Sequence, residues 1–208
     1  MKRNRNKFKI NKLVVLICIL LFFIFFISEK GRERVNTWIS LFEAPDNNEI
    51  ITADYQVDPA RELEKARVTK WIARKYKVSH KAVRKIVDIS FEAGEKFEVD
   101  PYVIIAVMAI ESSFNPFAES SAGALGLMQV MPKVHKEKFE KYGGLDNSID
   151  VKVNIYVGTE ILKNYLLRYG NFQRALRAYV GVSQTSKSRY PKKVLRVRER
   201  LKKLIKAG

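Results

Sequence analysis

The sequence has little of the chemistry from which disulfide frameworks and metal sites are built. Among its 208 residues are one cysteine, Cys18, and two histidines, His80 and His135. A single cysteine excludes an intramolecular disulfide and every zinc site that depends on paired cysteines. Because neither histidine stands at ligand spacing from another donor, we expect no metal and no cofactor.

Strand signals are also nearly absent, and acidic residues are few. Lys and Arg number 39 against 22 Asp and Glu, so the net charge is +17, while 47% of the residues are hydrophobic. That apolar content excludes a disordered basic tail protein and is sufficient for a core. From Arg61 onward the apolar residues recur at helical spacing. The sequence therefore predicts an all-α domain in which any sheet is limited to a small loop element.

The positive charge is concentrated at the two ends of the chain. The first twelve residues contain six Lys or Arg, and residues 187–208 contain ten with a single acid, Glu199. Residues 13–186 then carry a net charge of only +2. We expect the basic C-terminal stretch to meet an anionic envelope polymer or phospholipid headgroups.

Residues 13–27, LVVLICILLFFIFFI, form a run of 15 residues without a charge. A helix rising about 1.5 Å per residue covers roughly 22 Å, which spans a hydrocarbon core of about 30 Å when Lys12 and Lys30 snorkel. No small-residue cleavage site follows the run, so an uncleaved signal anchor is favoured over a signal peptide. A buried core segment is disfavoured because charged residues flank the run. The basic residues before the anchor orient it in the cytoplasmic (inner) membrane, with the remaining chain on the periplasmic, cell-wall side.

The predicted organisation has four parts. These are a cytoplasmic basic tail over 1–12, the signal anchor over 13–28, a juxtamembrane linker over 29–60 and a helical domain over 61–208. Start and stop signals predict seven helices. Four have both ends marked: about 61–76, 102–112 after Asp100 and Pro101, 150–169 before Gly170, and 172–179. Three have only a marked start, at Ser79, Pro132 and about Pro191, and the helix from Ser79 has the inner face Val83, Ile86, Val87 and Phe91.

The helix expected after Pro101 is apolar nearly all round and ends in one acid, Glu111. Desolvation disfavours the charged form of a carboxyl group and raises its pKa. A carboxylic acid that keeps its proton near neutral pH is what glycoside cleavage requires, because the leaving oxygen must be protonated. On this helix alone, a glutamate that is merely paired with backbone donors or an arginine is an equal alternative.

The segment that follows, ESSFNPFAESSAGALGLMQVMP over 111–132, favours the functional interpretation. Gly123 and Gly126 predict a loop in which the backbone can approach a ligand closely. Ser120 and Gln129 have short and medium-length polar side chains of the kind that hydrogen-bond to an acetamido sugar and hold it in position.

This segment resembles the catalytic motif of lytic transglycosylases of the soluble-lytic-transglycosylase (SLT) type, relatives of the goose-type lysozymes. The Glu-Ser, Asn-Pro and Gly-Ala-x-Gly-Leu-Met-Gln-x-Met-Pro elements of that family are all present. A second family block corresponds to a helix containing Asn154 and to Ala175, Leu176, Ala178 and Tyr179. The resemblance covers roughly residues 83–195 and implies a lysozyme-like all-α fold.

Carried over residue by residue, the resemblance implies roles for four side chains. Glu111 matches the acid and base, Ser120 and Gln129 match substrate contacts, and Tyr179 matches a cleft tyrosine near the glutamate. At Val180 the sequence departs from the family, which usually has Asn there. The implied reaction cleaves the β-1,4 bond between N-acetylmuramic acid (MurNAc) and N-acetylglucosamine (GlcNAc) in peptidoglycan glycan strands, forms 1,6-anhydroMurNAc ends and uses no cofactor.

Three other functions stay open at this point. A hydrolytic muramidase of the same fold would need a second carboxylate, for which Glu119, Asp146 and Asp150 are the candidates. An inactive glycan-binding scaffold is suggested by Val180. Residues 71–87 have the sequence pattern of a DNA-binding helix-turn-helix, and DNA binding would agree with the positive net charge. The predicted side of the membrane argues against chromosomal DNA, so no nucleic acid partner is expected.

Overall fold

The computed structural model describes residues 58–206, which lie within one compact unit spanning Asn48–Gly208. The predicted basic tail over 1–12, the signal anchor over 13–28 and nearly all of the linker over 29–60 lie outside the described residues. Over residues 58–206, no helix is both long enough and apolar enough to cross a membrane.

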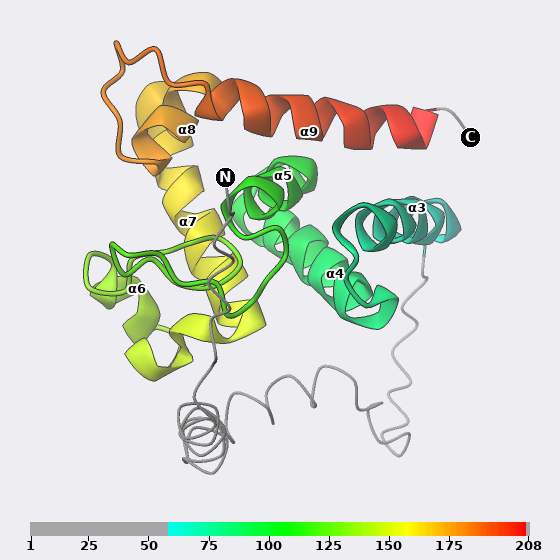
Figure 1. The fold of residues 1–208 in the computed structure, drawn as a ribbon, viewed down its shortest axis with the longest axis horizontal. Coiled ribbons are helices and arrows are strands. Elements are labelled where there is room, and N and C mark those ends of the chain that lie inside the picture. The colour runs from blue at the N-terminus through cyan, green and yellow to red at the C-terminus, as the bar shows by residue number, and fades with distance from the viewer. Residues whose placement is uncertain (1–57, 207–208) are drawn as a thin grey trace, which may run out of the picture. The chain divides into compact units, whose positions relative to one another are not determined.

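The described chain is built from helices (Figure 1). In chain order they are α3 (Pro59–Tyr76), α4 (His80–Phe97), α5 (Pro101–Glu111), α6 (Lys136–Glu140), the 3-10 helix η1 (Leu145–Ile149), α7 (Val151–Tyr169), α8 (Phe172–Tyr179) and α9 (Tyr190–Lys206). In residues 58–206, β-structure is limited to two isolated bridges, Glu119 with Leu125 and Leu125 with Val130. The prediction of an all-α domain with a small β element in a loop is therefore confirmed.

Helix α5 is the centre of the core. Every residue from Tyr102 to Ala109 is buried, as its nearly unbroken apolar sequence predicts. Asp100 begins the helix, since its carboxylate accepts a hydrogen bond from the Tyr102 amide at 2.9 Å, and Pro101 occupies the first turn, where a missing N–H removes no helical bond. Helices α4 and α9 pack against α5.

Helix α9 runs antiparallel to α5, and Asp100 fixes their relative position. The Asp100 Oδ2 atom lies 2.8 Å from Arg198 Nε, 2.7 Å from Arg198 Nη2 and 3.0 Å from Lys202 Nζ. These contacts join the beginning of α5 to the second half of α9. The beginning of α9 is thereby placed at the other end of α5, where Glu111 lies.

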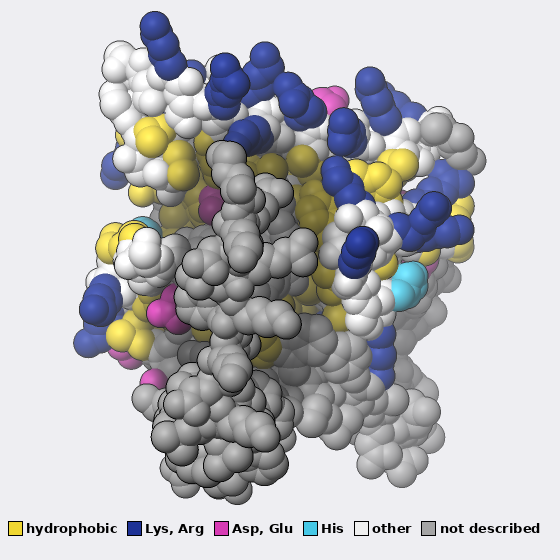
Figure 2. All heavy atoms as spheres, in the orientation of Figure 1, with side chains coloured by type: hydrophobic (Ala, Val, Ile, Leu, Met, Phe, Trp, Pro, Cys, Tyr) yellow, Lys and Arg dark blue, Asp and Glu magenta, His cyan; other side chains and the backbone are white. Residues whose placement is uncertain are grey.

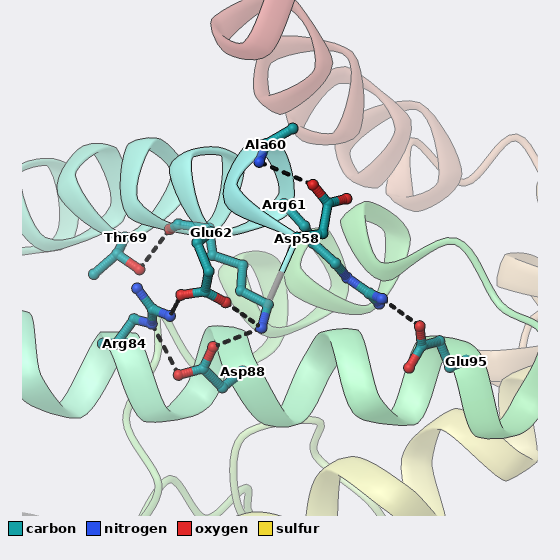
Figure 3. Close-up of polar contacts among 9 residues, drawn as sticks. Asp58, Ala60, Arg61, Glu62, Thr69, Arg84, Asp88 and Glu95 are labelled. Carbon is teal, nitrogen blue, oxygen red and sulfur yellow. Dashed lines mark hydrogen bonds and ion pairs between the residues drawn. The ribbon is translucent and has the colours of Figure 1, made fainter. Parts of the chain in front are cut away.

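Helices α3 and α4 occupy the position of the predicted helix-turn-helix. Between them, Arg84 of α4 binds Glu62 of α3 and Asp88 of its own helix (Figure 3). Lys65 pairs with the same two acids. The inner face of α4 packs in the core, with Val83, Ile86, Val87 and Phe91 all buried as predicted. The second helix of the pair is thus a core helix whose Arg84 is already neutralised by acids of the domain.

Most predicted helix boundaries are confirmed, and one is wrong. Asp150 begins α7, Gly170 ends it in the left-handed conformation, and α8 covers 172–179. No helix begins at Pro132. The amides of Val134 and His135 both bond to the Met131 carbonyl, but His135 then leaves the helical region at φ −119°, ψ 34°, so the helix starts only at Lys136.

Candidate active site

Glu111 is the last residue of α5, and a tight reversal of the backbone follows it. Ser113 and Phe114 both adopt left-handed conformations, at φ 52° and 66°, which are unfavourable for residues other than glycine. The Phe114 side chain is fully buried and packs edge-on against Tyr76 with ring centroids 4.9 Å apart. This packing holds the reversal in place, and it thereby fixes the position of Glu111 at the edge of the core.

The Glu111 carboxyl group has a tyrosine partner from a distant part of the chain. The Tyr190 hydroxyl, at the beginning of α9, donates a hydrogen bond to Glu111 Oε1 at 2.5 Å. Burial raises the pKa of Glu111, and the hydrogen bond from Tyr190 opposes this rise because it favours the carboxylate. Burial and the neighbouring charge of Glu111 raise the pKa of Tyr190 well above its usual range, so the phenol remains a donor.

Tyr179 lies beside this pair at the end of α8. Its hydroxyl donates to the Met128 carbonyl at 2.8 Å, which joins α8 to the loop that follows α5. Burial, together with the charge of Glu111, raises the pKa of Tyr179 well above its ordinary value. Helices α5, α8 and α9 therefore converge on one carboxyl group with two neutral phenols around it.

The loop after Phe114 is held by its own side chains. Ser120 Oγ accepts from the Ala124 amide at 3.0 Å. The Gln129 side-chain amide donates to the carbonyls of Ala118 and Gly126, at 2.9 and 3.1 Å, and its backbone is left-handed at φ 48°. Both predicted substrate contacts thus have a structural use in this loop.

Asn154 of α7 connects the loop to the rest of the domain. This side chain is 1% exposed; its Oδ1 accepts from the Met128 amide at 2.8 Å, and its Nδ2 donates to the carbonyls of Leu125 and Ser148 at 2.9 and 2.8 Å. A Cβ on Gly126, whose φ is +77°, would lie 2.4 Å from Asn154 Nδ2. The glycine is therefore required by the close approach of Asn154, and the approach of a ligand to this loop stays a prediction. At Gly123, by contrast, a Cβ would meet nothing within 4 Å.

Tyr190 was not among the residues singled out from the sequence. It lies 79 residues from Glu111 and follows a loop without a motif. Its position before Pro191, at the start of the basic terminal helix, was the available local signal. That signal marks a helix start and says nothing about which side chain the tyrosine meets.

The other acids considered from the sequence lie in different surroundings. Glu119 is exposed, and Asp150 begins α7 by accepting from the Val153 amide at 2.9 Å. Asp146 lies in η1. Among the described residues, burial and Tyr190 are the influences on the pKa of Glu111, and no second carboxylate contributes. Residues 58–206 contain no group of three or more His, Cys, Asp or Glu side chains arranged to hold a metal ion.

Comparison with solved structures gives the class of fold. The chain is similar to the 70 kDa soluble lytic transglycosylase of Escherichia coli at a TM-score of 0.53, with 20% identity over 70% of this chain and 30% of that chain. At this level of identity the likeness concerns the fold alone. The described domain therefore has the helical, lysozyme-like fold found in that protein.

Sequence comparison gives the family. The Transglycosylase SLT domain family matches residues 88–193, half of the chain, and the chain belongs to this family. It is 37% identical over 109 residues to a transglycosylase of Enterobacteria phage PRD1, which covers 50% of this chain and 39% of that protein. It is 42% identical over 88 residues to the membrane-bound lytic murein transglycosylase C of Edwardsiella ictaluri, covering 39% of this chain and 24% of that protein. The chain thus matches well under half the length of these relatives.

Proposed function

We propose that this protein is a membrane-anchored lytic transglycosylase that cleaves the β-1,4 bond between MurNAc and GlcNAc in peptidoglycan. One observation carries the proposal: a half-buried carboxyl group at the end of α5, Glu111, has a raised pKa and a hydrogen bond from Tyr190. The family match supports the reaction class, and the name of the Edwardsiella ictaluri relative, a lytic murein transglycosylase, supports the substrate class.

In the proposed reaction Glu111 acts first as an acid and then as a base, with a different proton in each step. The protonated carboxyl group donates to the glycosidic oxygen, and the bond between this oxygen and C1 of MurNAc breaks. The acetamido group of MurNAc stabilises the cationic C1. The Glu111 carboxylate then removes the proton of the MurNAc 6-hydroxyl as its oxygen bonds to C1, which forms the 1,6-anhydro ring without consuming water.

Tyr190 supports the charged state that lies between these two transfers. Its hydroxyl already points at Glu111 Oε1, so it can stabilise the carboxylate that forms when the glutamic acid gives up its proton. We assign substrate contacts to the polar atoms of Ser120 and Gln129 that make no hydrogen bond within the loop. Gln129 Oε1 accepts no hydrogen bond from the described residues and is available to a sugar. Val180 ends α8 and is 38% exposed, which offers an apolar surface where the family usually has Asn.

The hydrolytic alternative needs a second carboxylate that activates water. Asp150 is engaged as the N-cap of α7 and Glu119 is exposed to solvent on the loop, which favours the anhydro product. Membrane anchoring is proposed from residues 13–27 and agrees with the names of the membrane-bound relatives. The catalytic domain would then face the cell wall from the outer side of the cytoplasmic membrane.

Product analysis tests the function. The full chain, incubated with purified peptidoglycan, should release fragments that end in 1,6-anhydroMurNAc, each lighter by one water than the hydrolytic product in mass spectrometry. Glu111→Gln should reduce the release by at least about 100-fold, because the substituted amide neither donates nor accepts the transferred proton.

Glu119→Gln is the matched control, since this acid is exposed in the same loop and should keep near wild-type activity. If the wild type produced reducing MurNAc ends and Glu119→Gln did not, the protein would be a hydrolase instead. Binding of peptidoglycan without any cleavage by the wild type would identify a scaffold.

A further inference from the structure

A groove between α3 and α9 lies outside the candidate active site. Its volume is about 590 Å³, and its walls are formed by Arg67, Lys70, Trp71, Arg74, Lys75 and Leu204. The two helices are joined there by Arg67, whose Nη1 donates to the Ile205 carbonyl at 3.3 Å. Four of the six lining side chains are cations and none is an acid, which sets this groove apart from the neutral surroundings of Glu111.

The two sides of α3 differ in how their charges are balanced. On the side that faces α4, Arg61 pairs with Glu95 (Figure 3). Lys65 on the same side forms ion pairs with both Glu62 and Asp88. On the groove side, none of the four lining cations forms an ion pair with any acid in the described part of the chain. The groove therefore holds positive charge that the domain itself does not neutralise.

Lys75 shows the consequence of this crowding. Burial lowers the pKa of Lys75, and the charge of Arg200 on α9 lowers it further. Like charges on α3 and α9 thus repel each other beside the groove, and an anion bound near them would be attracted by both. The Lys75 ammonium also lies 4.5 Å from the centre of the Trp71 ring, which fixes this cation beside an aromatic surface.

Apolar side chains lie among these cations. Trp71 and Leu204 line the groove itself, and Leu63 is 54% exposed. The helical spacing of residues 63, 67, 70 and 74 places Leu63 on the same face of α3 as the lining cations. Figure 2 shows Lys and Arg side chains gathered over α9 and around α3, with hydrophobic side chains between them. The combination of Trp, Leu and Lys or Arg on one face is typical of surfaces that bind at a membrane interface.

We propose that the α3–α9 groove docks the domain on anionic phospholipid headgroups at the surface of a bilayer. The cations bind the headgroup phosphates, and Trp71 with Leu63 enters the interface beside them. A soluble polyanion would use the cations but would give no reason for the exposed Leu63 or the partly exposed Trp71, so the bilayer is the partner that uses the whole face. Docking through α3 and α9 fixes the orientation of the domain over the membrane.

An environment-sensitive fluorophore on α3 of the full chain tests the proposal. Ala66, which is exposed on α3, would be changed to Cys in a Cys18→Ser background and labelled. The labelled chain would be incorporated into vesicles of phosphatidylcholine alone or of phosphatidylcholine with phosphatidylglycerol. We expect a blue shift of emission only when phosphatidylglycerol is present, and its reversal by high salt. A label at Glu137→Cys on α6, which packs against α7 and η1, should give no shift.

Two triple variants separate the groove from net charge. Lys70→Glu, Arg74→Glu and Lys75→Glu together should abolish the shift, since they reverse three exposed groove cations. Lys133→Glu, Lys136→Glu and Lys187→Glu change the net charge equally at exposed lysines outside the groove and should retain the shift. Thermal unfolding of both variants shows whether each is folded.

The opposite results would overturn the proposal. These are a blue shift of emission in vesicles of phosphatidylcholine alone, an equal blue shift from the label on α6, or a blue shift that persists in the variant Lys70→Glu, Arg74→Glu, Lys75→Glu. Soluble polyphosphate added to the phosphatidylcholine sample is the remaining arm. If it produced the full shift, the groove would be a site for a soluble polyanion and the membrane proposal would be wrong.

Discussion

Glu111 is subject to two opposing influences. Its position at the end of the buried helix α5 favours the protonated form, and the hydroxyl of Tyr190 favours the carboxylate. In the proposed reaction Glu111 first donates and then accepts a proton, and this balance helps because neither form is stabilised so strongly that the other becomes inaccessible. Tyr190 is therefore expected to set the pH range of the reaction.

Tyr190→Phe tests this expectation through the pH dependence of kcat/KM. Removing the donor takes away the stabilisation of the carboxylate, so the pKa of Glu111 rises further and the acid stays protonated to higher pH. The alkaline limb of the profile should therefore move to higher pH in peptidoglycan solubilisation assays. Tyr142→Phe, on the α6 side of the domain, should leave the limb in place. A lower rate with an unmoved limb would mean that Tyr190 is only structural.

At the scale of elements, a single side chain of α7 holds the loop over residues 115–131. Asn154 makes three hydrogen bonds to backbone groups from the loop and from η1, and Gly126 leaves the space that it occupies. Tyr179 then attaches α8 to the same loop through Met128. The loop is therefore fixed by long-range polar contacts, although it contains almost no regular secondary structure.

Asn154→Ala should destabilise the domain by about 2–4 kcal/mol, because the Met128 amide and the Ser148 carbonyl would lose a hydrogen bond in the interior and the Leu125 carbonyl would keep only the Val130 amide. Urea unfolding followed by circular dichroism measures this loss. Asn171→Ala is the matched control: Asn171 is an exposed N-cap of α8, and its loss should cost about 1 kcal/mol. Equal losses in the two variants would show that the loop does not depend on Asn154.

At the scale of the whole molecule, the excess of positive charge is unevenly distributed. Helix α9 contains one acid, Glu199, among eight Lys and Arg. Arg198 and Lys202 use their charge to hold α9 against α5 through Asp100, whereas Arg200 faces the cations of α3. Part of the charge thus maintains the fold, and part opposes it.

The stability of the domain should therefore increase with salt. Raising the ionic strength from about 0.02 to 0.5 M shortens the screening length from roughly 20 Å to about 4 Å, which weakens the repulsion across the α3–α9 groove. Scanning calorimetry should show a higher Tm for the wild type, and a smaller increase for the variant Lys70→Glu, Arg74→Glu, Lys75→Glu. An equal increase in both proteins would show that the groove charges do not oppose folding.

The helices could be predicted from the sequence because their signals are local. Asp100 and Pro101 begin α5, Asp150 and Gly170 delimit α7, and the apolar spacing assigns the core faces. The family motif lies within a short segment that begins at Glu111, and the family match confirms the resemblance. Local signals were less reliable at Pro132, where the first turn forms but the chain does not continue as a helix.

The sequence by itself determined the helical class, the order of the helices and the position of Glu111, since capping and helical periodicity depend on residues only a few positions apart. The tertiary structure alone decided that Tyr190 meets Glu111 across 79 residues, that Asn154 requires Gly126, and that α3 and α9 share a groove joined by a contact across 138 residues. Such pairings depend on how whole helices pack around α5. The periodicity of a single segment does not show which distant side chain will lie next to it after packing.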